Sequence, residues 1–358
     1  MFTVAVKGTY PKFTSPPRPS LLARALKSWR TWQITDGELE RSLQRAEVEV
    51  VAEMVAAGCE VVWDGQLRWD GPAFLLGSLK GVKPSLNRMI GEKLPMVVEG
   101  ESLNGMSLDG DTSAGNGHHP HGLMQEKIEV IDRIGWQKPI LSNTFRFLSD
   151  RVPVDLRPVF TGPISLAQLC DNGYYEDDNY QRIIDIAKAL NREIEGLVAV
   201  GGKHFLIEEP LLLKGDFEVS QLEEITGILT NGISQPIFLS ASNEMTTDPE
   251  LLQALSFGGY CIDSYKLDPA SLQTWLTICE EKESIIELGV VNGRKSRIED
   301  PAEICQTLVA WGRAYSPDRL WASTTTGLGG LTREVAFLKL QALAKGAELA
   351  RRELAKDE

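Results

Sequence analysis

Acidic side chains follow the ends of several short extended stretches, and they are the residues of this chain best suited to chemistry. The stretch 203–207 leads directly into Glu208 and Glu209, and Pro210 then restricts the backbone. Because side chains alternate along a strand, one of these two carboxylates points inward and the other aside. An inward carboxylate can hold a substrate ammonium group or act as a general base.

The other candidate residues are polar residues or glycines that also follow short extended stretches. They are Gly8, Thr9, Asp64, Gln66, Ser240, Ser242, Asp263, Asn292 and Thr326. Polar residues also terminate strands for purely structural reasons, so each single position keeps that second interpretation. Nearly every strand end carries one, however, which favours a shared site.

A separate group of imidazoles lies in a polar stretch between residues 109 and 122. His118, His119 and His121 occur within four residues and could together bind a transition metal. Pro120 restricts how they converge, and no carboxylate or thiol is placed beside them. We expect a loop that contacts substrate or has no function of its own.

Strands alternate with helices along most of the chain, which predicts an α/β fold with parallel strands. Amphipathic spacing predicts helices at 36–57, 217–230, 248–256, 269–282, 301–314 and 332–355, and helical segments that follow Pro163 to about residue 198. Predicted strands cover 2–7, 60–64, 155–160, 203–207, 236–240, 259–263, 284–289 and 319–323. Eight strands predict a (β/α)8 TIM barrel, in which chemistry is done at the carboxyl ends of the strands.

The region 71–135 interrupts this alternation with Pro, Gly and polar residues. We interpret it as a loop region inserted after strand 2, over the barrel mouth. The whole chain, 1–358, is then one barrel domain. A length of 358 residues is normal for such a barrel with an insertion.

Composition limits the kinds of binding partner and the cellular compartment that we expect for this protein. The net charge of −13 argues against nucleic acid or an anionic membrane as a partner. No run of 18 apolar residues predicts a membrane span, and the N-terminus lacks the pattern of a signal peptide. Five widely spaced cysteines do not predict a disulfide framework. We therefore expect a cytoplasmic protein that acts on a small molecule.

Five stretches carry a family likeness, and their order and spacing extend over almost the whole chain. The chain resembles the catalytic C-terminal half of cobalamin-independent methionine synthase, in the superfamily shared with uroporphyrinogen decarboxylase. The most specific motif is Gly-Leu-x-x-Leu-x-Arg-x-x-Ala-x-x-Lys-Leu at 327–340. The others are Gly-Thr-Tyr-Pro at 8–11, Thr-Gly-Pro at 161–163, Ile-Glu-Glu-Pro-Leu at 207–211, and Leu-Gly-Val-Val at 288–291 with Arg297 and Glu299.

The resemblance implies a (β/α)8 barrel that transfers a methyl group from a methyl-tetrahydrofolate to homocysteine. It also implies a zinc ion, held by a His-x-Cys pair, a Glu and a later Cys, that converts the thiol to a thiolate. At the corresponding positions this chain has Ser240 and Ser242, Asp263 or Ser264, and Thr326. Hydroxyls are poor zinc ligands. Zinc is expected for the family, but we expect no metal site of that kind here.

The substrate pocket departs from the family pattern as well. Gln66 stands where the family has a Glu, and Glu208 where it has an Asp. The Trp that stacks on the pterin is absent, since Gln168 and Leu169 lie in that region. The long N-terminal half of the full-length synthase has no counterpart in this sequence.

Three functions fit these observations. The first is a methionine-synthase-like methyltransferase with a folate, a methylated corrinoid protein or a simpler methyl donor. Glu208, Asp263 and Asp64 would then carry catalysis, and the remaining candidates, Glu209 among them, would bind substrate. The second is a metal-free lyase or decarboxylase on the same barrel. The third is a non-catalytic protein that binds a small molecule.

Overall fold

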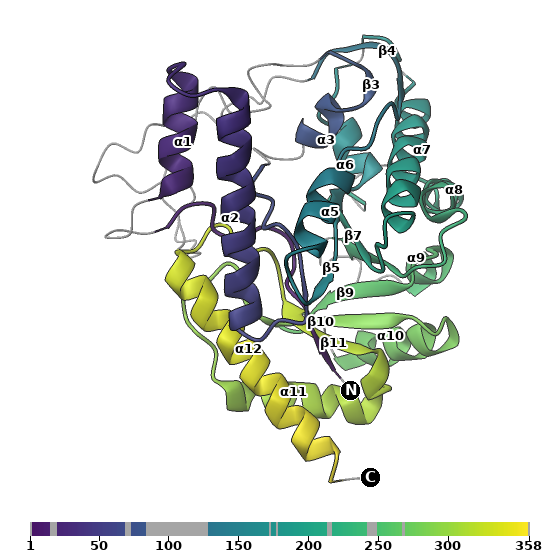
Figure 1. Cartoon of the computed structure of the whole chain (residues 1–358). Helices are drawn as coiled ribbons and strands as arrows, with labels where there is room; N and C mark the ends of the chain where they lie inside the picture. Colours follow the sequence, from purple (N-terminus) through teal and green to yellow (C-terminus); the bar gives the residue numbers. More distant parts are fainter. Residues whose placement is uncertain are drawn as a thin grey trace, which may run out of the picture.

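The fold consists of a parallel sheet with helices packed around it (Figure 1). The computed structural model describes residues 2–14, 20–68, 73–83, 128–171, 173–176, 178–212, 217–241, 249–266 and 269–356. The strands are β1 (Thr3–Val4), β2 (Val61–Val62), β3 (Lys80–Val82), β4 (Val130–Gly135), β5 (Asp155–Leu156), β6 (Val159–Thr161), β7 (Phe205–Glu209), β8 (Ile237–Ala241), β9 (Gly259–Asp263), β10 (Ile285–Val291) and β11 (Leu320–Thr324).

Seven of these strands form one sheet in the order β1-β11-β10-β9-β8-β7-β6, and all its pairings are parallel. A second parallel pair joins β2 to β5. A parallel bridge connects Ala5 to Val61, and Val6 N donates to Val61 O at 3.1 Å. Backbone hydrogen bonds therefore run from β1 to β2 and from β2 to β5 as well.

The predicted strand 155–160 is divided into β5 and β6, and Pro158 explains the division. Proline has no N–H to donate to a neighbouring strand. The backbone nitrogen of Arg157 donates to Val62 O at 2.8 Å, while Pro158 O accepts from Leu206 N at 3.0 Å. The chain thus pairs with β2 before the proline and with β7 after it.

Helices cover the sheet on opposite sides, with α1, α2 and α12 on one side in Figure 1 and α7 and α8 on the other. The predicted helices end within two residues of those observed. Helix α11 begins with Asp300 as its cap and Pro301 at its first position, as the sequence predicts. The helices are α1 (Leu21–Arg30), α2 (Asp36–Ala56), α3 (Ala73–Gly77), α5 (Ser142–Ser149), α6 (Pro163–Ala167), α7 (Asn179–Val198), α8 (Val219–Thr230), α9 (Pro249–Ala254), α10 (Pro269–Glu281), α11 (Pro301–Ala314) and α12 (Arg333–Leu354), with a 3-10 turn at Pro317–Arg319.

Three helices, α1, α3 and α5, were not predicted from the sequence. Of the region 71–135, the structure describes 73–83 and 128–135, which contain α3 and the antiparallel pair β3 and β4. His118, His119 and His121 lie outside the described residues. The interpretation of this region as an insertion over the mouth therefore stays a prediction.

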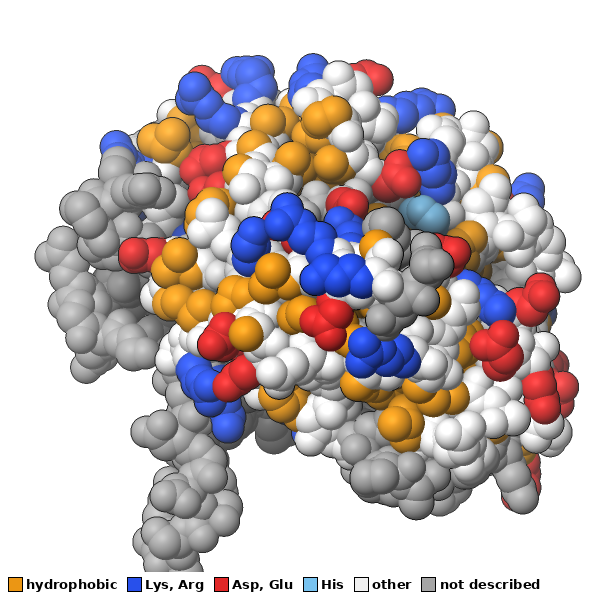
Figure 2. Space-filling view, turned by 90° about the horizontal axis from the view of Figure 1, so that it is seen from below, with side chains coloured by type: hydrophobic (Ala, Val, Ile, Leu, Met, Phe, Trp, Pro, Cys, Tyr) orange, Lys and Arg blue, Asp and Glu red, His pale blue; other side chains and the backbone are white. Residues whose placement is uncertain are grey.

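The surface shown in Figure 2 carries acidic and basic side chains interspersed with apolar ones. The net charge of −13 is therefore not gathered into a single acidic field on this face. Within the described ranges, no helix is long and apolar enough to cross a membrane. All five cysteines are buried and free.

Candidate functional site

Polar side chains meet at the carboxyl ends of the parallel strands. In the pairing register, Glu208 of β7 lies between Thr161 of β6 and Ser240 of β8. Asp263, the last residue of β9, pairs with Gly289, and Thr324, the last of β11, pairs with Val291. We call this side of the sheet the strand-end face. In parallel α/β sheets this is the side at which ligands bind.

Glu208 presents a half-buried carboxylate at the strand-end face. Gly8 makes room for it, because a Cβ on Gly8 would lie 2.7 Å from Glu208 Oε1. The Gln66 side chain hydrogen-bonds to the Glu208 carboxylate, and Lys7 and Arg157 supply nearby positive charge. Burial nevertheless outweighs these partners and raises the pKa of Glu208. A carboxylate with a raised pKa is a better proton acceptor than an exposed one.

Gln66 reaches Glu208 from an unusual backbone conformation. Gly65 has φ +71° and Gln66 has φ +55°, so two consecutive residues are left-handed. This conformation suits glycine but is strained for other residues, and such strain collects at functional sites. The turn is held by Tyr10 N, which donates to Gly65 O at 3.1 Å. It joins the end of β2 to the loop that follows β1.

Beneath Glu208 lies an interior charge cluster of Lys7, Arg157, Cys261 and Glu287. Arg157 and Glu287 are 1% and 0% exposed and form a two-bond ion pair, with Arg157 Nη2 3.0 Å from Glu287 Oε1. The Cys261 thiol donates to Glu287 Oε2 at 3.2 Å. Burial opposes ionisation, but the Arg157 guanidinium lowers the pKa of Glu287 to about 2.

Lys7 completes the cluster from the first strand. Its side chain is 3% exposed, and its ammonium donates to Thr325 O at 3.3 Å. Sequence reasoning missed Lys7, Arg157 and Glu287. The signal that could have found them is a charged residue inside or directly after an apolar strand, because such a residue is buried only when paired.

Glu209 points away from Glu208, toward the start of α6. Its carboxylate accepts from Ile164 N at 2.9 Å, from Ser165 N at 2.8 Å and from the Ser165 hydroxyl. Gly162 permits this approach, since a Cβ there would lie 2.2 Å from Glu209 Oε2. Burial outweighs these donors and raises the pKa of Glu209 to about 7. The Thr-Gly-Pro and Glu-Glu-Pro stretches are therefore joined through this one side chain.

Asp64 lies fully inside the protein, behind the strand-end face. Its side chain is 0% exposed; Oδ1 accepts from Gln66 N at 2.8 Å, and Oδ2 has no partner among the described residues. Burial and then the charge of Glu47 raise the pKa of Asp64 to about 8. Glu47 is itself paired with Arg68. Asp64 thus positions the strained Gly65–Gln66 turn.

Asp64→Asn is expected to flatten the pH dependence of stability. The folded chain keeps this carboxyl protonated up to about pH 8, while in the unfolded chain it ionises above its ordinary value of 3.8. Raising the pH between these values therefore favours unfolding, by on the order of 6 kcal/mol for this group over the whole interval and about 4 kcal/mol between pH 5 and pH 8. The asparagine oxygen still accepts from Gln66 N. Guanidinium unfolding at pH 5 and pH 8 measures the difference, with the exposed Asp150→Asn as control. Equal pH slopes in Asp64→Asn and wild type would contradict the assignment.

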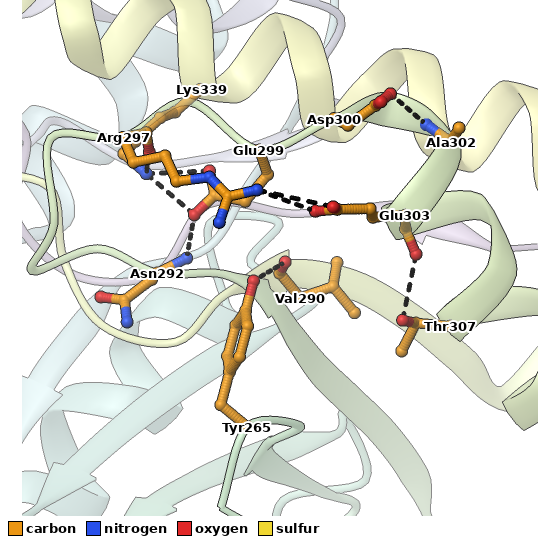
Figure 3. A network of polar contacts seen from close by, with 10 residues as sticks. All are labelled: Tyr265, Val290, Asn292, Arg297, Glu299, Asp300, Ala302, Glu303, Thr307 and Lys339. Carbon is orange, nitrogen blue, oxygen red and sulfur yellow. Dashed lines mark hydrogen bonds and ion pairs between the residues drawn. The ribbon is translucent and has the colours of Figure 1, made fainter.

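Asn292 and the final motif form the network in Figure 3. The backbone nitrogen of Asn292 donates to Glu299 Oε1 at 2.9 Å, and Lys339 Nζ donates to both Glu299 oxygens at 2.9 and 2.8 Å. The Lys339 side chain is 0% exposed. This ion pair fixes α12 against the loop after β10. Lys339, the lysine of the final motif, therefore has a structural role. The side-chain amide of Asn292 is directed away from Glu299 (Figure 3).

The threonines at the end of β11 have three different environments. Thr324 is 0% exposed and Thr325 accepts from Gly293 N at 3.2 Å, while Thr326 is half-buried. Thr9 is exposed and accepts from Gly329 N at 3.3 Å, which joins the loops after β1 and β11. Ser240 and Asp263 are half-buried at the ends of their strands, and Ser242 lies outside the described residues.

The described residues at the strand-end face do not fit a zinc ion of the kind that the resemblance implies. Ser240 and Thr326 offer hydroxyls, and Asp263 offers a single carboxylate. Among the described residues, no three His, Cys, Asp or Glu side chains are placed to hold a metal together. A structural or catalytic zinc site normally needs at least three nitrogen, sulfur or carboxylate ligands.

Comparison with known proteins agrees with the resemblance. A methionine synthase of Sulfurisphaera tokodaii is 26% identical over 347 residues, which are 95% of this chain and 91% of that protein. A methionine synthase of Thermococcus kodakarensis is 24% identical over 349 residues, or 96% and 93% of the two chains. No family model matches the chain.

Solved structures show the same fold. A B12-independent methionine synthase from Shewanella sp. W3-18-1, in complex with selenomethionine, superposes with a TM-score of 0.71 at 16% identity over 99% of both chains. A putative B12-independent methionine synthase from Listeria monocytogenes superposes with a TM-score of 0.67 at 15% identity, also over 99% of both chains. The chain therefore resembles the B12-independent methionine synthases in sequence order and in fold.

Proposed function

We propose that this chain is a methyltransferase that moves a methyl group from a methyl-folate or methyl-corrinoid donor to the thiol of homocysteine or a related thiol, without a metal. The observation that carries the proposal is the carboxylate of Glu208. It lies half-buried at the strand-end face, beside Gly8, with Gln66 as its hydrogen-bond partner. Positive charge from Lys7 and Arg157 lies around it.

The catalytic problem is the ionisation of the thiol, since an ordinary thiol has a pKa of roughly 8.5 and only the thiolate is a strong nucleophile. Glu208 would take the thiol proton as general base. The sulfur lone pair then forms the bond to the methyl carbon. The bond from that carbon to the donor breaks, and its electron pair stays with the donor. Lys7 supplies a fixed positive charge near the sulfur anion.

The remaining strand-end residues complete the proposed site. Asp263 and Ser240 would contact the acceptor from the neighbouring strands β9 and β8, and Thr326 and Thr9 from the joined loops. Asn292 would orient the acceptor through its side-chain NH2 group, since its Oδ1 accepts from Arg294 N at 2.9 Å. Asp64 and Glu209 support these groups from behind, through the Gly65–Gln66 turn and through α6.

We also propose that the eight parallel strands form one closed (β/α)8 barrel and that residues 1–358 are a single domain. The backbone hydrogen bonds from β1 to β2 and from β2 to β5 support the closure. With β5 and β6 counted as one strand, the order runs around a full ring.

The proposal is tested by incubating the purified chain with homocysteine and either methyl-tetrahydrofolate or methylcobalamin, and measuring methionine by mass spectrometry. Methionine is expected from one donor, at a rate that a chelator leaves unchanged. Loss of the activity with chelator, and its return with zinc, would overturn the metal-free mechanism. Homocysteine binding without methionine from either donor would instead favour a non-catalytic binding protein.

A further inference from the structure

A cavity of about 400 Å³ lies outside the strand-end face, between α1, the middle of α2 and the start of α12. This volume is within the usual range of small-molecule sites. We call it the rim pocket. Six of its lining residues carry the argument: Lys12, Ser20, Ser42, Arg45, Glu49 and Arg333.

Arg333 brings a buried guanidinium to the wall of this pocket. The residue is 7% exposed, and its Nε donates to Glu53 Oε2 at 2.8 Å. Its Nη2 has no hydrogen-bond partner among the described residues, since Glu49 Oε1 lies 3.6 Å away. A buried donor without an acceptor is costly. An oxyanion in the pocket would satisfy it.

The N-terminus of α1 (Leu21–Arg30) also favours an anion in the rim pocket. Ser20 caps the helix by accepting from Ala23 N at 3.1 Å, and Ser20, Leu21 and Leu22 all line the pocket. The first turn of α1 contains no acidic residue. A helix N-terminus presents free N–H groups and a positive dipole end, which favour an anion.

The charged residues that line the rim pocket are mostly positive, whereas the chain as a whole is negative. Among the described residues that line the pocket, Lys12, Arg45 and Arg333 are cationic and Glu49 is the one anionic residue, in a protein of net charge −13. Arg45 is exposed, and in the described part of the chain it has no recorded ion pair. We propose that the rim pocket is a second binding site, for a small, doubly charged oxyanion such as a phosphate or a dicarboxylate.

The pocket is connected to the strand-end face through the loop after β1. Gly8 and Thr9 of this loop lie at the face, while Lys12 and Thr14 line the pocket. Tyr10 lies between these two pairs of residues in the sequence, and the Arg333 guanidinium stands 5.9 Å from the centre of its ring. An anion bound by Lys12 and Arg333 therefore fixes the loop that carries Gly8.

Calorimetric titration of the full chain tests the proposal, with inorganic phosphate in one arm and glutarate in the other, at constant ionic strength. Arg45→Gln is expected to weaken binding by about tenfold, as for loss of one hydrogen bond to a charged group. Its matched control is Arg41→Gln, an exposed arginine of the same helix that does not line the pocket. No methyl donor or thiol is present, so the outcome is independent of the proposed methyl transfer.

Saturable binding that Arg45→Gln weakens and Arg41→Gln leaves intact would support the site, and the stronger arm would identify the anion as phosphate or carboxylate. The absence of binding in both arms would overturn the proposal. An equal loss in both variants would also overturn it, because it would indicate a general charge effect. Circular dichroism of both variants checks that the fold is unchanged.

Discussion

Glu208→Gln is expected to lower the rate of methyl transfer by roughly 10²-fold or more while leaving the fold intact, as for loss of a general base. Glutamine has nearly the same shape, so Gln66 and Gly8 can still pack against it. It cannot accept the thiol proton, and it removes the negative charge that faces Lys7 and Arg157. Steady-state methionine formation measures the loss.

The control for this variant is Glu209→Gln. It changes the neighbouring carboxylate, whose three donors come from Ile164 and Ser165 of α6. It is expected to lower stability more than it lowers the rate. If Glu208→Gln retained full turnover, or if Glu209→Gln alone abolished it at unchanged stability, the base would not be Glu208.

Glu287→Gln is expected to destabilise the protein by about 3–5 kcal/mol, the usual effect of leaving a buried charge unpaired. Arg157 is 1% exposed and pairs with Glu287 through both of its terminal nitrogens. Without that partner, Arg157 and Lys7 would be buried with only Glu208 to balance them. Chemical denaturation of the variant and the wild type gives the free energy of unfolding.

The double variant Arg157→Met, Glu287→Leu distinguishes the effect of an unpaired charge on stability from the effect of altered packing. It removes both ions together, so it is expected to recover most of the lost stability. The exposed pair Arg192 and Glu195 is the control, and Arg192→Met there should change stability by less than about 1 kcal/mol. A double variant as unstable as Glu287→Gln would show that shape, not charge, decides the stability of this interior.

Local patterns sufficed for the parts of the fold that depend on local physics. The cap at Asp300, the proline at 301 and the alternation of strands with helices are all visible in a short window. Helix α1 was missed even though Ser20 caps it, because a proline-rich stretch, 16–19, precedes it and reads as a loop.

The candidate site was only partly predictable, because its support comes from distant segments. Glu208 could be found, since it ends an apolar strand. The raised pKa of Asp64 depends in part on the charge of Glu47 in α2, and the ion pair of Arg157 depends on Glu287, which is far away in the sequence. The spacing of residues along the sequence does not predict that Glu47 lies near Asp64 or that Glu287 lies near Arg157. For the same reason the sequence could not show that Glu209 serves α6.

The pairing of β1 with β11 has a consequence for how the protein is made. On one side, backbone hydrogen bonds join β1 to the segment of β2, which is synthesised early. On its other side, β1 obtains its neighbour β11 only when the last strand has been synthesised. Until then Thr3 and Val4 have an unpaired edge on the side of β11, and the surface against which α12 packs is incomplete. Such long-range pairing slows folding and leaves strand edges exposed to other chains. We expect nascent chains that stop before residue 320 to depend on chaperones.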